Sequence, residues 1–512
     1  MEEPERKSEP VLPWMRQPVE VDSCEESPLE LVPCLDPRLE NALRNIGVKT
    51  LFPVQVAVWQ ETIGPGAAER DLCICTPTGS GKTLAYALPI VQMLSTRTLQ
   101  RLRALVVLPT RDLAIQVKAV FDAIAPAVGL SVGLSIGQNP VAADAAQIVR
   151  HPRNFLGMFG ESEDMDKNSI MSVDVLVATP GKLMDHISGT KGFTLEYLRY
   201  LVVDETDRLL REAYQDWLPN VLSATKSNGH RDIRTSLGSI TTLRRAGVER
   251  GFKDKTYPRV MKMILSATLT RDPSKLAQLA LHQPLFLSLS SAKKRYILPE
   301  QLENYIVTCE SKLKPLYLLA LLQCLQGEQT VVFTSSVVST HRLSTLLNCF
   351  EGLSFRITEF SREYHQSLRS KVLNSFREGN VQVLVASDVF TRGMDVEGVM
   401  NVVNYDMPKF TKTYVHRAGR TARAGRSGRC FTLLLREEIK RFNKLLSKAD
   451  NNNYSTYKLP EKSIEELHPF YFAALGKLKE IVESETTGRD YSSHLIASKA
   501  EEWINNVDDR TM

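Results

Sequence analysis

The sequence lacks a long apolar run, a zinc-type cysteine pair and a strong excess of either charge. No apolar run approaches the roughly 18 residues that cross a bilayer, so no membrane span is expected. Its eight cysteines are scattered, and no pair is spaced as in a zinc finger or ribbon. Such thiols are typical of a reducing compartment. The first residues, MEEPERKSEP, are acidic and proline-rich, unlike a signal or transit peptide. These absences predict a soluble intracellular protein.

The charge balance of the chain is nearly even. Its 64 Lys and Arg residues against 59 Asp and Glu give a net charge of +5, which is too small to identify a polyanionic partner. Any nucleic-acid surface must therefore be local. At 512 residues the chain is too long for one hydrophobic core, so two domains with tails are expected.

Short apolar runs alternate with helical patterns along most of the chain. They occur at residues 72–75, 104–108, 173–178, 200–203 and 261–265, and again at 330–333, 381–385, 401–404 and 430–434. The runs are apolar at successive positions, as in parallel strands covered on both faces. Ligands of such sheets bind at the carboxyl ends of the strands. The pattern predicts an α/β fold with two parallel sheets.

Changes in composition divide the chain into five segments. Residues 1–35 are rich in Pro, Glu and Ser and predict a disordered or loosely docked lead. Two α/β domains are predicted at 36–288 and 300–435, joined by a linker at 289–299. After about 436 the strands are expected to stop, and apolar residues at helical spacing predict a helical extension over 436–512.

Two polar stretches, 150–172 and about 224–257, interrupt the first domain and are interpreted as surface insertions. The second carries Arg231, Arg234, Arg244, Arg245, Arg250, Lys253 and Lys255. A solvated face and an auxiliary contact with RNA or a partner protein both remain open for this basic stretch.

The run TPTGSGKT at 76–83 follows a strand and opens a helix, which predicts a phosphate-binding loop for ATP. Its glycines let the backbone approach the phosphates. Lys82 is expected to reach the β and γ phosphates, and the Thr83 hydroxyl to bind Mg²⁺. The predicted nucleotide-binding residues of the loop are Thr78, Gly79, Ser80, Gly81, Lys82 and Thr83.

A second strand ends in the acidic run DETD at 204–207. Asp204 is expected to hold Mg²⁺, largely through water, and Glu205 to orient or deprotonate the attacking water. The alternative interpretation is that these carboxylates only stabilise a helix N-terminus, because negative charge there complements the helix dipole. The nearby phosphate loop favours the catalytic reading.

Phosphoryl transfer also requires positive charge on the phosphate oxygens. The second domain contains HRAGRTAR at 416–423, in which Arg420 and Arg423 lie one helical turn apart. Arginines supplied from another domain can act as fingers, and such fingers raise rates by about 10³–10⁵. A basic surface turn is the alternative. Because the arginine fingers belong to one domain and the phosphate loop to the other, we predict that ATP hydrolysis requires the two domains to close on each other.

Together these motifs resemble the DEAD-box RNA helicases of superfamily 2, over about residues 40–435. The resemblance implies two tandem RecA-like domains that act as a monomer, with ATP between them and RNA across both. Gln55, in LFPVQ, is similar to the glutamine that reads adenine in this family, and Asp395 to the residue that contacts the ribose.

The same resemblance assigns further residues. It implies RNA contacts from Thr110, Arg111, Gly137, Thr179, Gly181, Lys182, Thr334, Gln366, Arg369 and Ser387. It implies coupling of ATP state to unwinding by Asp207, Ser266, Thr268 and His416. A second SAT tripeptide begins at Ser223, but Ser266 follows an apolar run and is the preferred match.

The sequence also departs from the family pattern. Val48 stands where an aromatic residue usually stacks on adenine, and Ala422 stands in place of a glycine. The motifs LFPVQ and DETD, with the long insertion before SAT, are most similar to a nucleolar branch linked to large ribosomal subunit assembly. This similarity implies precursor ribosomal RNA as a partner and a nucleolar location.

Two other functions are compatible with the motifs. A DNA translocase of superfamily 2 would be stimulated by duplex DNA but not by RNA, and Gln55 argues against it. A scaffold without turnover would tolerate loss of Lys82 or Glu205. The presence of both residues, together with Arg420 and Arg423, argues for an RNA-stimulated ATPase.

Overall fold

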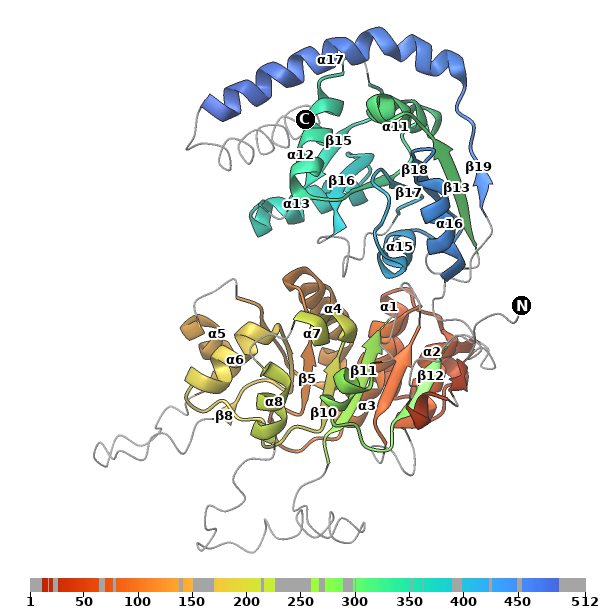
Figure 1. Ribbon diagram of the computed structural model, residues 1–512. Coiled ribbons are helices and arrows are strands. Elements are labelled where there is room, and N and C mark those ends of the chain that lie inside the picture. The colour runs from red at the N-terminus through yellow and green to blue at the C-terminus, as the bar shows by residue number, and fades with distance from the viewer. Residues whose placement is uncertain are drawn as a thin grey trace, which may run out of the picture. The chain divides into compact units, whose positions relative to one another are not determined.

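The computed structural model describes most of the chain. The described residues are 12–16, 18–21, 26–63, 70–76, 80–137, 141–150, 170–212, 216–225, 259–266, 272–288, 298–299, 301–350, 353–361, 363–388, 398–422, 426–448 and 454–487. The chain forms two compact units, Met1–Lys293 and Lys294–Met512, and each is described here by itself (Figure 1).

The N-terminal unit is built on an eight-stranded sheet in which every neighbouring pair is parallel. The strand order is β1-β12-β4-β11-β10-β5-β9-β6. The strands span Val19–Glu20 (β1), Leu285–Ser288 (β12), Leu72–Cys75 (β4), Met261–Ser266 (β11), Tyr200–Val203 (β10), Ala104–Val107 (β5), Val175–Ala178 (β9) and Val132–Ser135 (β6). Two short ladders pair Ser27–Pro28 (β2) with Thr50–Leu51 (β3), and Val149–Arg150 (β7) with Ile170–Met171 (β8).

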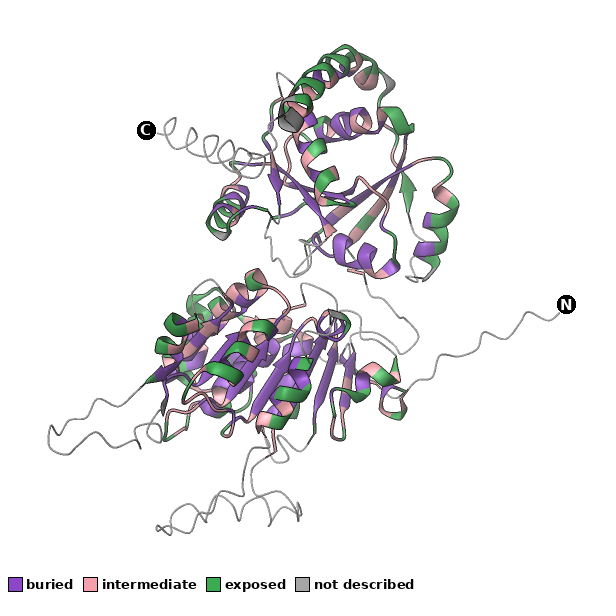
Figure 2. Ribbon diagram, turned by 60° about the vertical axis from the view of Figure 1, so that its left-hand side comes forward, coloured by how far each residue is buried: buried purple, intermediate pink, exposed green. Residues whose placement is uncertain are grey.

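Helices cover both faces of this sheet, because successive strand residues point to opposite sides. One face packs on Pro37–Asn45 (α1), Pro53–Thr62 (α2), Lys82–Leu94 (α3) and Arg111–Ile124 (α4). The other packs on Pro180–Gly189 (α6), Thr206–Glu212 (α7), Trp217–Thr225 (α8) and Pro273–Ala277 (α10). Val141–Ile148 (α5) follows β6. Along β5, Leu105 and Val107 face the second layer, while Ala104 and Val106 face the first. The central strands β11, β10, β5 and β9 are therefore buried at every position, as the purple ribbons in Figure 2 show.

The C-terminal unit repeats this architecture with seven parallel strands in the order β15-β16-β14-β17-β18-β13-β19. They span Ile357–Phe360 (β15), Val383–Ser387 (β16), Thr330–Thr334 (β14), Asn401–Asn404 (β17), Gly428–Leu434 (β18), Leu302–Thr308 (β13) and Ser455–Thr456 (β19). Gln366–Arg377 (α13), Thr411–Ala418 (α15) and Ile439–Lys448 (α16) pack on one face. Lys314–Cys324 (α11), Val337–Asn348 (α12) and Glu461–Thr487 (α17) pack on the other.

The predicted fold class is confirmed, with two differences in detail. The described part of the N-terminal lead is docked rather than disordered: β1 pairs with β12, and Val21 and Leu29 are buried in the core. The prediction that strands stop after 436 is wrong at β19, which adds to the edge of the sheet beside β13. The basic insertion lies outside the described residues. No helix among the described residues is long and apolar enough to span a bilayer.

Candidate functional site

The phosphate loop connects β4 to α3. Gly81 precedes the helix with a φ of 77°, a left-handed conformation that glycine adopts without strain. The Lys82 ammonium donates a hydrogen bond to the Thr76 carbonyl oxygen at 2.9 Å, and the Ser80 hydroxyl donates to Thr76 Oγ1 at 2.9 Å. Thr83 lies in the first turn of α3. Thr78 and Gly79 lie outside the described residues. The helix N-terminus and Lys82 together offer positive charge to an anion.

Gln55 is held directly against this loop. Its side-chain nitrogen donates to the Gly81 carbonyl oxygen at 3.1 Å, and its oxygen accepts from the Phe52 backbone N–H at 2.8 Å. A Cβ at Gly81 would lie 2.4 Å from the Gln55 amide nitrogen and 2.9 Å from the Phe52 ring. The structure therefore places Gln55 beside the loop, and it adds Phe52, to which the sequence assigned no role. Val48 packs against the core instead.

Asp204 follows β10 and is buried, with 5% of its surface exposed. Its Oδ1 accepts from the Glu205 backbone N–H at 2.8 Å, and the Tyr86 hydroxyl lies 3.4 Å from Oδ2. Burial, reinforced by the Glu205 carboxylate and opposed by Lys82, raises the pKa of Asp204 to about 6. A buried carboxylate that is costly to ionise fits a divalent cation, because the cation would offset that cost.

In the metal-free protein, Asp204→Asn is expected to increase stability above pH 6. The pKa of Asp204 is higher in the folded state than in the unfolded chain, so its stabilising contribution is present below about pH 4 and is lost as pH rises through 6. A rise from 3.8 to about 6 corresponds to at most about 3 kcal/mol. Urea unfolding without nucleotide, followed by tryptophan fluorescence, should show the variant gaining 2–3 kcal/mol over the wild type at about pH 7.5. The two proteins should have similar stabilities near pH 4. If the free energies of unfolding of the two proteins changed with pH in parallel, this account would be contradicted.

Glu205 has a positive φ of 51°, an uncommon conformation for a residue with a side chain. Backbone strain of this kind amounts to about 1–3 kcal/mol and concentrates at functional sites. The Glu205 backbone N–H is engaged by Asp204, and the side chain is half-buried. Of the two consecutive carboxylates, that of Asp204 is buried and that of Glu205 is half-buried.

Asp207 and Ser266 are brought together across the sheet. The Ser266 hydroxyl donates a short hydrogen bond to Asp207 Oδ1, and the Thr76 backbone N–H donates to the Ser266 carbonyl at 3.3 Å. This arrangement arises because β11 lies between β4 and β10. The alternative SAT residue, Ser223, lies in α8 instead. Thr268 lies outside the described residues.

The predicted RNA residues of the N-terminal unit gather at the other half of the same sheet edge. Thr110 and Arg111 follow β5, Gly137 follows β6, and Thr179, Gly181 and Lys182 follow β9. A Cβ at Gly137 would lie 2.9 Å from Lys182 Cε and 3.4 Å from the Arg111 guanidinium. Since β5, β9 and β6 are adjacent, the strand order places the predicted RNA residues on one half of the sheet edge and the predicted nucleotide residues on the other.

The predicted RNA residues of the C-terminal unit are less exposed. Thr334 ends β14 and is fully buried, with its hydroxyl 2.6 Å from that of Thr340, and Ser387 ends β16 with 4% exposure. In this structure Thr334 therefore presents no surface to RNA, and Ser387 presents very little. Gln366 begins α13, which also carries the half-buried Arg369. Asp395 lies outside the described residues.

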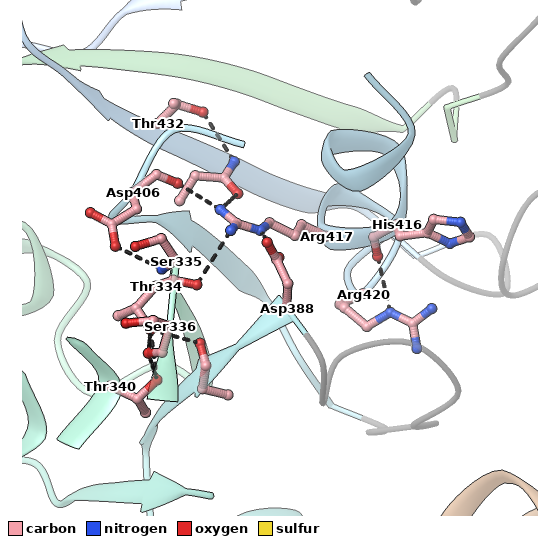
Figure 3. A network of polar contacts seen from close by, with 12 residues as sticks. Thr334, Ser335, Ser336, Thr340, Asp388, Asp406, His416, Arg417, Arg420 and Thr432 are labelled. Atoms are coloured by element: carbon pink, nitrogen blue, oxygen red, sulfur yellow. Dashed lines mark hydrogen bonds and ion pairs between the residues drawn. The ribbon is translucent and has the colours of Figure 1, made fainter. Parts of the chain in front are cut away.

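Arg417 is the central polar residue of this unit, although the sequence assigned it no role (Figure 3). It is 1% exposed and forms an ion pair with Asp388. Its guanidinium also donates to Asn404 Oδ1 at 3.2 Å and to the carbonyl oxygens of Asp406 at 2.6 Å and Thr334 at 3.4 Å. One buried side chain thus joins the ends of β14, β16 and β17 to α15.

Arg420 lies just beyond α15 and is 5% exposed. Its Nε donates to the carbonyl of the buried His416 at 3.1 Å, and Figure 3 shows its guanidinium directed away from the Arg417 network. Arg423 lies outside the described residues. Between the two arginines, Ala422 adopts a φ of 54° where the resembling family has glycine.

Ala422→Gly is therefore expected to be neutral or stabilising by up to about 1 kcal/mol. A left-handed conformation costs alanine about 1–2 kcal/mol, and glycine's greater freedom in the unfolded chain offsets part of the gain. Ala418→Gly, the same change at the buried last residue of α15, should instead destabilise by about 1 kcal/mol. Urea unfolding measures the stability of both variants. An equal loss of stability in Ala422→Gly and Ala418→Gly would contradict this prediction.

Comparisons with known proteins match this geometry. Residues 52–276 match the DEAD/DEAH box helicase family model, and residues 313–425 match the helicase conserved C-terminal domain. The chain is 57% identical over 482 residues to DEAD-box ATP-dependent RNA helicase 1 of Arabidopsis thaliana, covering 93% of this chain and 92% of that protein. It is 36% identical to the human ATP-dependent RNA helicase DDX51, covering 94% of this chain and 74% of that protein. The fold is similar to that of Mss116p bound to single-stranded RNA and AMP-PNP, with a TM-score of 0.65, 22% identity, and coverage of 88% and 82% of the two chains.

Proposed function

Because the chain belongs to the DEAD-box family of ATP-dependent RNA helicases, we propose that it remodels precursor ribosomal RNA in the nucleolus, as a monomer. Membership gives the general activity, in which ATP hydrolysis drives local RNA unwinding or displacement. Membership does not identify the RNA, the cellular location or the roles of single residues, and these are what we propose.

The nucleotide half of the N-terminal unit would hold magnesium ATP. Asp204 and Thr83 are the residues that would hold Mg²⁺, largely through water, and the buried carboxylate of Asp204 fits that role. When bound, the ion neutralises charge on the phosphates and orients them. Lys82 would exchange its hydrogen bond with the Thr76 carbonyl for phosphate oxygens, and Gln55 would present its amide to adenine.

Hydrolysis would require both units. Glu205 would orient and deprotonate the attacking water, and Arg420 and Arg423 would stabilise the charge that develops on the transferred phosphoryl group. Asp207, Ser266, Thr268 and His416 would transmit the nucleotide state to the RNA residues. We propose that ATP and RNA together close the two units, and that hydrolysis reopens them and releases the RNA.

The RNA residues favour recognition without sequence preference. The cations of Arg111 and Lys182 would contact phosphates rather than base edges, and Thr334 and Ser387 would reach the RNA only after their surroundings rearrange. Bending of one strand would melt a short duplex locally. Phosphate contacts also predict strong salt sensitivity of binding.

The assignment to precursor ribosomal RNA rests on the resemblance of LFPVQ, DETD and the insertion before SAT to the nucleolar branch. It is tested by ultraviolet crosslinking in cells with a Glu205→Gln variant, which should retain bound RNA. We expect the crosslinked reads to concentrate in large-subunit precursor RNA and the protein to localise to nucleoli. Reads concentrated in messenger RNA would overturn the assignment without affecting the helicase activity.

A further inference from the structure

Helix α16 (Ile439–Lys448) presents a basic outer face that the helicase motifs do not use. Its inner face packs on α15, with Phe442, Leu445 and Leu446 buried and the Phe442 ring 5.7 Å from that of Tyr414. Since each residue turns a helix by about 100°, the positions opposite this apolar stripe point outward. Those positions are Lys440, Arg441 and Lys444, and all three are exposed.

These three cations form no ion pair within the described part of the chain, although Glu437 and Glu438 directly precede the helix. The helix contains no acidic residue, and among the described residues no carboxylate forms an ion pair with any of the three. Lys440 and Lys444 lie four residues apart and Arg441 and Lys444 lie three apart, so their side chains share one surface. Helix α17, by contrast, intersperses its lysines with a larger number of glutamates. The basic face of α16 is therefore a local feature of this unit.

An exposed aromatic residue adjoins this face. Phe410 immediately precedes α15 and is 69% exposed. The next residue, Thr411, donates from its hydroxyl to the Leu445 carbonyl at 3.4 Å, which brings the start of α15 against the second half of α16 (Figure 1). The exposed Lys409 and Phe410, which directly precede Thr411, are therefore on the same side of the unit as the second half of α16.

We propose that Lys409, Phe410, Lys440, Arg441 and Lys444 form a second contact surface for single-stranded RNA, outside the helicase motifs. Cations along a surface contact phosphates, and an exposed ring among them offers a platform on which a base stacks. A protein interface would need a larger apolar centre than one phenylalanine supplies. The surface would hold the RNA strand that extends beyond the helicase core. This inference does not depend on which cellular RNA is bound.

Neutralising the basic face should weaken binding of long RNA in a salt-dependent way. Full-length K440A/R441A/K444A protein is compared with wild type on uridine homopolymers of about 8 and about 30 nucleotides, the first within and the second well beyond the roughly 4–16 nucleotides of known single-strand sites. Each lost phosphate contact should reduce the slope of log affinity against log salt by about 0.7, so the triple variant should lose about 2. The short RNA should bind equally to both proteins, and kcat at saturating RNA should not change.

The matched control removes three lysines from the outer surface of α17. The K462A/K477A/K479A variant makes the same charge change on the same unit, and it should retain the wild-type salt slope. Phe410→Ala should weaken long-RNA binding about 5- to 150-fold, the range expected for one stacked base, and leave the slope unchanged. Melting temperatures check that each variant is folded.

Two results would overturn the inference. One is a triple variant with the salt slope and long-RNA affinity of the wild type. The other is unchanged RNA binding together with loss of an acidic protein from purified complexes, which would assign the surface to a protein partner.

Discussion

Glu205→Gln is expected to reduce ATP turnover by at least about 100-fold while leaving ATP and RNA binding close to wild type. A positioned general base contributes roughly 10²–10⁴ to a rate, and the amide cannot accept the proton of the attacking water. The fold should survive, because the strained backbone at Glu205 is held by its N–H bond to Asp204, which the substitution leaves intact. Steady-state ATPase assays with saturating RNA measure kcat, and fluorescent nucleotide titration measures affinity.

Comparison with Lys82→Ala separates a defect in ATP turnover from a defect in ATP binding. The Lys82 ammonium lies at the start of α3, where it would contact phosphates directly, so this variant should lose nucleotide affinity as well as turnover. Glu466→Gln, an exposed glutamate on α17, is the matched control and should behave as wild type. A Glu205→Gln protein with normal RNA-stimulated turnover would remove Glu205 from the mechanism.

The sequence predicted the central strands well, because burial on both faces leaves a strong signal. The predicted bounds of β4, β10 and β17 are those of the structure. The sequence missed β13, whose residues alternate irregularly between exposed and buried because only the two-residue β19 lies beyond it. It also missed β1 and β19, which are too short and exposed to leave an apolar pattern.

The candidate site could be predicted in part. Residues that follow parallel strands meet at one edge of a sheet, so the grouping of Lys82, Asp204 and Ser266 follows from the strand assignments. The order of the strands does not follow from them. The contacts of Tyr86 with Asp204 and of Ser266 with Asp207 depend on β11 inserting between β4 and β10, although it is last of the three in the chain.

Arg417 was missed for a related reason. Arg420 and Arg423 were chosen from the sequence because phosphoryl transfer needs cations. Nothing in the sequence indicated which residues would pair with Arg417. A signal was present: Arg417 follows Tyr414, Val415 and His416 and precedes Ala418 in a short helix, close to apolar residues that are expected to be buried. Its partners come from three separate strand ends, and only the folded sheet brings them together.

Arg417→Ala is expected to destabilise the C-terminal unit by about 3–5 kcal/mol. Removing one partner of a buried ion pair leaves the others without compensation. Asp388 is 33% exposed and can regain water, but the buried carbonyl oxygen of Thr334 loses a donor. The loss of packing against Phe333, whose ring centre is 5.3 Å from the guanidinium, adds to this. Urea unfolding followed by circular dichroism measures the change.

Two further variants separate the buried network from the charge itself. Arg417→Lys keeps the positive charge but cannot reach Asp388, Asn404 and Thr334 together, so an intermediate loss is expected. Arg342→Ala removes an exposed arginine from α12 and should change stability by less than about 0.5 kcal/mol. Equal stability of Arg417→Ala and Arg342→Ala would contradict the structural role.

The Arg417 variants should also lose RNA affinity and ATP turnover together. Arg417 fixes the Thr334 end of β14, a predicted RNA contact, and lies one helical turn before Arg420, a predicted finger. Loosening α15 therefore displaces both sites at once, whereas Glu205→Gln should affect turnover alone. Measuring RNA affinity and kcat on folded Arg417→Lys protein, below its unfolding temperature, tests this link. A variant that kept one property at the wild-type level and lost the other would show that the two sites are positioned independently.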